Sequence, residues 1–162
     1  MFQGIKKLFG GKKEEGQILA PVAGQAVPLS EVPDPAFAQE ILGKGVAILP
    51  SENEFKAPAS GEVTVLFETG HAVSIRTESG ADVIVHIGLD TVNLKGQFFI
   101  THVKQGDTVK AGDLLITADI EQIKAAGYEV ITSVIVCNVS DFPDMVCHTG
   151  KAVKAMDEII TL

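Results

Sequence analysis

The chain has 162 residues, 46% of them hydrophobic and 21% charged, which is long enough for one domain with a substantial apolar core. Its 21 acidic residues against 13 lysines and arginines give a formal net charge of −8, which argues against a nucleic-acid partner. No run of about eighteen apolar residues is present to span a bilayer, and no secretory signal is recognisable, so we expect a cytoplasmic protein with reduced cysteines.

Residues 1–16 form a leader whose composition differs from the rest of the chain. Its apolar residues recur at helical spacing, with lysines among and after them. Two alternatives fit: a helix that forms on anionic lipid, giving peripheral membrane contact through residues 2–13, or a flexible, solvated segment. The apolar residues are Phe2, Ile5, Leu8 and Phe9, and the lysines are Lys6, Lys7, Lys12 and Lys13.

From Gln17 onward, short strand-like runs alternate with turns that contain Gly and Pro. This pattern predicts an all-β domain over residues 17–162, an antiparallel β-sandwich or barrel with one or two short helices. Asp34 as cap, Pro35 as first residue and Gly43 as terminator predict a helix at 34–42. A second helix is expected at residues 119–127, and the clearest strands are residues 62–67, 72–75, 82–87, 113–118 and 129–139.

Two segments of the domain are similar to each other. Residues 18–29 and 55–66 share an Ala-Pro pair, a Gly three residues later and a terminal Leu. Because a solenoid needs about three repeats, the similarity predicts two related β-corners.

Two of the four histidines lie at the ends of a predicted β-hairpin. Ser79 and Gly80 supply turn chemistry, and if Thr77 faces Gly80, His71 lies directly opposite His86. Directly opposed residues have Cβ atoms about 4.5–5.5 Å apart. The hairpin therefore predicts a pair of imidazoles in contact.

Facing imidazoles suit three roles. They can close the end of a hairpin with no chemical role. They can bind a metal such as zinc, but no HxH, HExxH or CxxC motif supplies further ligands, so His71 and His86 would need one from a partner. They can also act as a nucleophile and a hydrogen-bonding helper, with Thr69 orienting one ring and Gly88 allowing a phosphate or a partner to approach closely.

The segments ETGHAVSI, VHIGLDTVNLKG and VPDPAFAQEILGKGVAILPS resemble the glucose-type IIA component of the bacterial phosphoenolpyruvate-dependent sugar phosphotransferase system. The resemblance runs from about Gln17 to the C-terminus and implies an antiparallel β-sandwich. It also implies that His86 takes phosphate from the phosphocarrier HPr and passes it to a cysteine on the IIB domain of a sugar permease. His71 then corresponds to the second active-site histidine, and Thr69 to the threonine that hydrogen-bonds to it.

The same resemblance implies a docking surface for partner proteins. Asp90 falls where the family meets basic residues of its partners. Apolar positions assigned to docking are Phe37, Ile41, Leu42, Val46, Phe67, Ile84 and Val92.

Other features are weighed as alternatives. KQGDTVKAGDLL resembles the turn of biotinyl and lipoyl carrier domains, but ITADIEQIKAAG offers no suitably placed modifiable lysine, so we interpret the match as shared turn chemistry. Cys137 lies in an apolar run and is expected in the core. Cys147 and His148 are adjacent, so on a strand they point to opposite faces and do not form a catalytic pair.

We therefore expect a monomeric cytoplasmic phosphotransferase component that works through a phosphohistidine and requires no cofactor. Its expected partners are HPr and a IIB domain, and proteins regulated by its phosphorylation state are a further expected class. The alternatives are a biotinyl- or lipoyl-like carrier and a purely regulatory protein-binding module.

Overall fold

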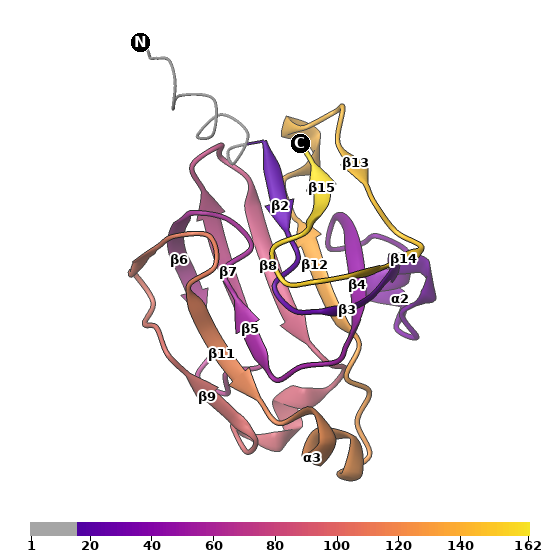
Figure 1. Ribbon diagram of the computed structural model, residues 1–162, viewed down its shortest axis with the longest axis vertical. Coiled ribbons are helices and arrows are strands. Elements are labelled where there is room, and N and C mark those ends of the chain that lie inside the picture. Colours follow the sequence, from indigo (N-terminus) through magenta and orange to yellow (C-terminus); the bar gives the residue numbers. More distant parts are fainter. Residues whose placement is uncertain (1–15) are drawn as a thin grey trace.

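The computed structural model describes residues 16–162, and its framework is a large antiparallel sheet (Figure 1). The spatial order of its eight strands is β10-β6-β7-β8-β12-β4-β3-β14, so the strands that flank the histidines lie in the interior of the sheet. The strands are β3 (Gly24–Pro28), β4 (Lys44–Pro50), β6 (Gly61–Leu66), β7 (Ala72–Thr77), β8 (Asp82–Ile87), β10 (Thr108–Val109), β12 (Thr132–Val136) and β14 (Lys151–Val153).

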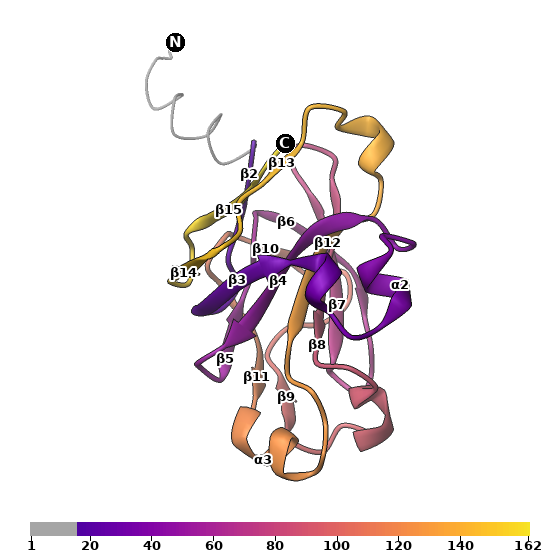
Figure 2. The same ribbon diagram turned by 90° about the vertical axis from the view of Figure 1, so that its right-hand side faces the viewer.

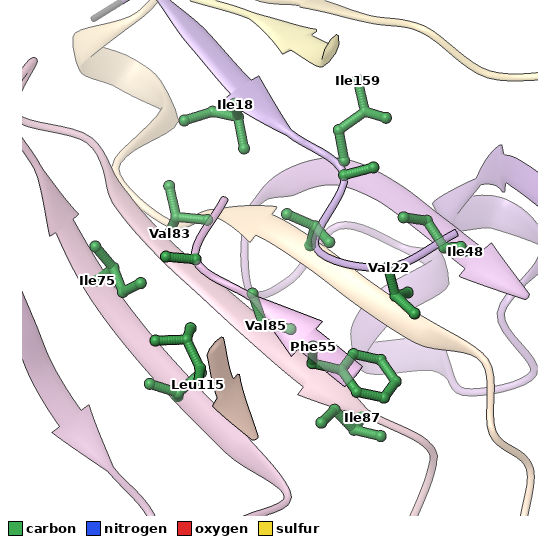
Figure 3. Close-up of a cluster of buried hydrophobic side chains, with 14 of the residues drawn as sticks. Ile18, Val22, Ile48, Phe55, Ile75, Val83, Val85, Ile87, Leu115 and Ile159 are labelled. Atoms are coloured by element: carbon green, nitrogen blue, oxygen red, sulfur yellow. The ribbon is translucent and has the colours of Figure 1, made fainter. Parts of the chain in front are cut away.

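Two three-stranded sheets complete a sandwich with the large sheet. Their strands are β5 (Glu54–Lys56), β11 (Leu114–Ala118) and β9 (Phe99–Thr101), and β13 (Val146–Cys147), β15 (Glu158–Thr161) and β2 (Gln17–Leu19). Phe55 and Leu115 from one small sheet, and Ile18 from the other, meet Val83 and Val85 of the large sheet in one buried cluster (Figure 3). The predicted antiparallel β-sandwich is therefore confirmed.

Strand β8 shows why the histidine segment faces away from this core. Successive side chains of a strand point to opposite faces. Val83, Val85 and Ile87 are buried in the central cluster, whereas Ile84 and His86 are only partly buried. His86 therefore lies on the outer face of the large sheet.

A second apolar cluster covers part of that outer face. It joins the 3-10 helix η1 (Leu29–Glu31) and helix α2 (Pro35–Ala38) to Ala47 of β4 and Ile135 of β12. Figure 2 shows α2 on the opposite side of the large sheet from β5 and β11. The site region is thus built on the face of the sheet that the small sheets leave open.

Helix α2 is shorter than the helix expected at residues 34–42. Asp34 caps it as predicted, with its carboxylate accepting from the backbone N–H of Ala36, and Pro35 is its first residue. The chain then takes a left-handed conformation at Glu40, with φ 59°, which ends the helix early.

The second predicted helix is confirmed as α3 (Ile120–Ala125). The side chain of Asp119 caps its N-terminus, and Gly127 follows it with φ 95°. The remaining elements are the 3-10 helices η2 (Thr91–Leu94) and η3 (Val139–Asp141). None of the helices in the described part of the chain is long and apolar enough to cross a membrane.

The two related segments form equivalent corners that bond to each other. The N–H of Leu19 donates to the carbonyl of Pro58 at 2.8 Å, and the N–H of Lys56 donates to Pro21 at 2.9 Å. A second pair, residues 105–116 and 149–160, was missed in the sequence. Asp113 and Asp157 accept from Lys110 and Lys154 N–H groups in matching turns, which explains the carrier-like motif as turn chemistry.

Two further expectations from the sequence concern Cys137 and the leader. Cys137 is exposed, and not in the core, because β12 ends at Val136 and the residue after it leaves the covered part of the sheet. The leader helix or flexible leader predicted for residues 1–16 lies almost wholly outside the described residues.

Candidate phosphate-transfer site

The register of the β7–β8 hairpin differs by one residue from the expected one. Ala72 lies opposite His86, and the N–H of Ile87 donates to the carbonyl of His71 at 2.8 Å. The shift arises in the turn, where Thr77 pairs with Ala81 and not with Gly80, because three residues form the loop. The direct cross-strand opposition of His71 and His86 was therefore wrong.

The two imidazoles nevertheless meet. Their ring centroids are 5.2 Å apart with the planes at 83°, an edge-to-face arrangement. His71 precedes the first residue of β7 and follows Gly70, whose φ of 74° turns the chain. Because His71 lies outside the strand, its ring escapes the alternation that would otherwise direct it to the core.

One hydrogen bond determines which nitrogen of His86 carries the hydrogen. Its Nδ1 lies 2.8 Å from the carbonyl oxygen of Gly88, so Nδ1 carries the hydrogen and Nε2 keeps its lone pair. Gly88 has φ 76°, and a Cβ there would lie 2.6 Å from the carbonyl oxygen of Glu129. A glycine is therefore required here by the close packing of the chain against Glu129.

His71 is held by Thr69, as predicted. The Thr69 hydroxyl lies 2.5 Å from Nδ1 of His71, and only 4% of His71 is exposed. In the tautomer in which Thr69 donates to Nδ1, Nε2 of His71 carries the hydrogen. That tautomer provides a donor beside His86.

Two phenylalanines extend the contact into a row of four rings. Phe37 packs on His86 with centroids 5.1 Å apart, and Phe67 packs edge-on against His71, also at 5.1 Å. The resulting order is Phe37, His86, His71, Phe67, which we call the ring row. Phe37 comes from α2 and His86 from β8, while His71 directly precedes β7 and Phe67 directly follows β6.

Both histidines have lowered pKa values. Burial, and then the neighbouring His86, lower the pKa of His71 to about 4. Burial also lowers the pKa of His86, although the Gly88 carbonyl and the carboxylates of Asp34 and Asp90 oppose this. Both rings are therefore neutral at pH 7, which is the state in which an imidazole nitrogen is a nucleophile.

The structure separates the residues assigned to docking into three groups. Exposed ones are Ile41 (68%), Val92 (47%), Leu42 (43%) and Phe67 (41%), together with Asp90. Ile84 is partly buried, and Phe37 is buried, with 6% of it exposed. Val46 is fully buried in the central core, so its assignment to a docking surface is corrected.

No group of three or more His, Cys, Asp or Glu side chains suited to a metal ion occurs among the described residues. The site itself offers two imidazoles. A zinc ion there would need further ligands from another protein, as expected from the sequence.

Sequence reasoning missed two neighbours of His86. Asp34 was assigned only to capping, yet its charge also acts on His86. Ser133, buried in β12, lies directly opposite His86 in the sheet. The polar pair Thr132–Ser133 inside an otherwise apolar run was the available signal. The remaining histidines lie elsewhere, His102 bonded to Thr117 and His148 to Thr161.

Comparison with known proteins gives consistent matches. Residues 16–142 match the family model described as phosphoenolpyruvate-dependent sugar phosphotransferase system, EIIA 1. The glucose-specific EIIA component of Oceanobacillus iheyensis is 43% identical over 141 residues, covering 87% of this chain and 86% of that protein. The beta-glucoside-specific EIIBCA component of Bacillus subtilis (strain 168) is 50% identical over 125 residues, covering 77% of this chain.

This chain spans only 20% of that Bacillus subtilis protein. Among solved structures, glucose permease IIA from Mycoplasma capricolum matches with a TM-score of 0.80 and 37% identity. The match covers 89% of this chain and 93% of the other.

Proposed function

Because this chain belongs to the EIIA 1 family of the phosphoenolpyruvate-dependent sugar phosphotransferase system, and so is a phosphocarrier of sugar uptake, we propose that its phosphate acceptor is Nε2 of His86. The observation that carries the proposal is the hydrogen bond from Nδ1 of His86 to Gly88, since it commits one nitrogen and leaves the other as a nucleophile. The lowered pKa of His86 supports it further.

The acceptance of phosphate depends mainly on the relative position of Nε2 of His86 and the donor phosphorus. The donor is a phosphohistidine of an HPr-type phosphocarrier, and Nε2 of His86 attacks its phosphorus in line. The bond between phosphorus and the donor nitrogen breaks, and its electron pair stays on that nitrogen. Because such transition states are loose, orientation and charge stabilisation do most of the catalysis.

Donation sends the phosphoryl group to a cysteine thiolate of a IIB domain. The EIIBCA relatives carry the EIIA part in one chain with EIIB and EIIC, which supports a IIB partner for this chain. As the thiolate attacks, the bond from phosphorus to Nε2 breaks and its electron pair returns to His86. His71, held by Thr69, donates a hydrogen bond to the oxygens of the transferring group.

Partner proteins dock on the exposed apolar side chains next to the ring row. Phe67 contacts His71, Val92 follows Asp90 by two positions, and Ile41 and Leu42 follow α2 directly. Asp90 attracts a basic rim on the partner, and the chain's overall negative charge acts in the same direction.

A zinc ion is a competing ligand of the same two imidazoles. It would take the lone pair of His86 that phosphate needs, and a partner would supply further ligands. Zinc would therefore bind at an interface with a partner, and the transfer described above does not use it.

The function is tested by reconstitution with enzyme I, HPr and phosphoenolpyruvate, omitting each component in turn. Label should reach the wild-type chain only in the complete mixture, and His86→Ala should take none. His102→Ala, a change of an exposed histidine outside the ring row, is the matched control and should accept phosphate normally. Label on His86→Ala, or label that survives acid, would refute the proposal.

A further inference from the structure

Phe37 differs from the other apolar residues assigned to docking because it is covered by the protein itself. It is 6% exposed, whereas Ile41 is 68% exposed and Val92 47%. Its ring packs on the imidazole of His86 with centroids 5.1 Å apart. A side chain this buried presents little surface area to a partner. Its ring instead forms a fixed wall beside the imidazole of His86.

The wall is anchored independently of any partner. The N–H of Phe37 donates to the carbonyl of Asp34, and the Asp34 side chain caps the same turn. The Phe37 ring belongs to the apolar cluster that also contains Leu29 and Leu89. Since Leu89 follows Gly88, this cluster joins α2 to the loop that carries the hydrogen-bond acceptor of His86.

His86 needs such a wall because a single hydrogen bond does not fix the orientation of its ring. Rotation about χ2 of histidine is broad and roughly two-fold, so a flipped ring would lift Nδ1 from the Gly88 carbonyl. Phe37 on one side and His71 on the other both pack against the ring in its present orientation, with ring centroids 5.1 Å and 5.2 Å away, so they hinder its rotation. Removal of the Phe37 ring would also admit water and reduce the burial that lowers the pKa of His86.

We propose that Phe37 is a positioning residue for phosphate transfer, which keeps Nδ1 of His86 on the Gly88 carbonyl and Nε2 directed at the reacting phosphorus. The inference rests on the proposed role of His86. It assigns Phe37 to the chemistry of the acceptor and removes it from the surface that recognises partners.

The test uses the full chain with Phe37→Leu, which keeps an apolar side chain without a ring, and Phe37→Ala. Rapid-quench single turnovers with phosphorylated HPr give the maximal rate and the half-saturating HPr concentration. A misplacement of about 1 Å can cost about a hundredfold in rate. We expect the maximal rate to fall about tenfold for Leu and more for Ala, with half-saturation changed by less than about twofold.

A second readout does not depend on transfer. Nitrogen-15 NMR of the imidazoles at pH 8 should show His86 almost wholly as the Nδ1–H tautomer in the wild type. Both Phe37 variants should mix the tautomers and raise the pKa of His86. Phe55→Leu is the matched control, because Phe55 is a buried phenylalanine of the central core, lies outside the cluster that anchors Phe37 and is not a member of the ring row. It should destabilise the fold and leave the His86 signals and the maximal rate unchanged.

Two results would overturn the inference: a raised half-saturation with an unchanged maximal rate, which would make Phe37 a docking anchor, or wild-type tautomers and rates in both variants. If Phe37→Ala does not fold, Phe37→Leu decides. If the wild type takes no phosphate at all, the proposed function fails, while the tautomer measurement still judges the contact between Phe37 and His86.

Discussion

At the scale of single residues, the two histidines differ in what holds them. His86 is bonded to a backbone carbonyl, which cannot donate and therefore commits its tautomer. His71 is bonded to a hydroxyl, which both donates and accepts, and it is the more buried of the two. This difference supports the proposed roles, with His86 as the nucleophile and His71 as the hydrogen-bonding partner.

The burial of His71 has a consequence for stability against pH. Its pKa falls from 6.5 to about 4 on folding, so between these values the unfolded chain binds a proton that the folded chain does not. The free energy of unfolding is therefore unaffected by protonation of His71 above pH 6.5 and decreases as the pH falls toward 4. At about 1.36 kcal/mol per pKa unit, roughly 3 kcal/mol is at stake.

Urea unfolding of the wild type and His71→Gln at several pH values between 7 and 4 measures this. The variant should lose about 3 kcal/mol less than the wild type over that range. His102→Gln, an exposed histidine outside the site, should behave as the wild type. Equal pH dependence of the wild type and His71→Gln would show that burial does not hold His71 neutral.

His71 should matter more for giving phosphate away than for receiving it. Attack by the His86 lone pair needs little from its neighbour, whereas transfer to a thiolate brings two anionic groups together. Loss of one donor in such a site typically costs about 2.7–4 kcal/mol, or roughly a hundredfold to a thousandfold in rate. Rapid-quench rates of both half-reactions of His71→Gln should show near-normal acceptance from HPr and slow donation to IIB. Equal slowing of the two would contradict this role.

At the scale of elements, helix α2 holds Phe37 and brings a charge to the site. Asp34 does both jobs, since its carboxylate caps the helix and also raises the pKa of His86. Two substitutions separate the capping role from the electrostatic role. Asp34→Asn keeps a capping side chain without the charge, and Asp34→Ala removes both.

We expect the pKa of His86, followed by NMR, to fall in both variants. The free energy of unfolding should fall by about 1 kcal/mol in Asp34→Ala and change much less in Asp34→Asn. Glu31→Gln, in the neighbouring η1, controls for loss of a charge and should leave the pKa of His86 unchanged. A His86 pKa that does not respond to Asp34→Asn would show that the carboxylate acts only as a cap.

Elements were predictable where one local pattern determines them. The strand expected at residues 82–87 is β8 with the same bounds, and Asp34 and Asp119 stood at the starts of the two expected helices. The hairpin register was not predictable, because two- and three-residue loops fit the same turn residues and shift every pair by one. The contact of Phe37 with His86 was also hidden, since it joins elements about fifty residues apart and depends on how α2 packs.

At the scale of the whole molecule, the core and the site occupy opposite faces of the large sheet. The buried cluster beneath the small sheets contains Val83, Val85 and Ile87, while His86 faces outward between them. Substitutions in the ring row should therefore alter transfer with modest effects on the central core. The sandwich class followed from strand patterns, whereas the second pair of related turns was not predicted, although the two segments share a Val-Lys-Ala run and an Asp two residues after it.

The leader is the part of the molecule that should act apart from this fold. Strand β2 begins at Gln17 and pairs with β15, so this edge of the domain is formed by residues that follow the leader. Deletion of residues 2–15 should leave the thermal midpoint nearly unchanged and weaken binding to anionic vesicles, because the lysines of the leader suit that surface. Neutral vesicles are the control. Undiminished binding to anionic vesicles would favour the flexible-leader alternative.

The proposed function requires that phosphate bonds to one particular nitrogen, Nε2 of His86. Phosphorus–nitrogen correlation NMR of the nitrogen-15 labelled, phosphorylated chain tests it most directly, because it identifies both the histidine and the ring atom. We predict a single phosphohistidine, at Nε2 of His86, with the hydrogen of Nδ1 still directed at Gly88. Phosphorus on Nδ1, on His71 or on another residue would contradict it.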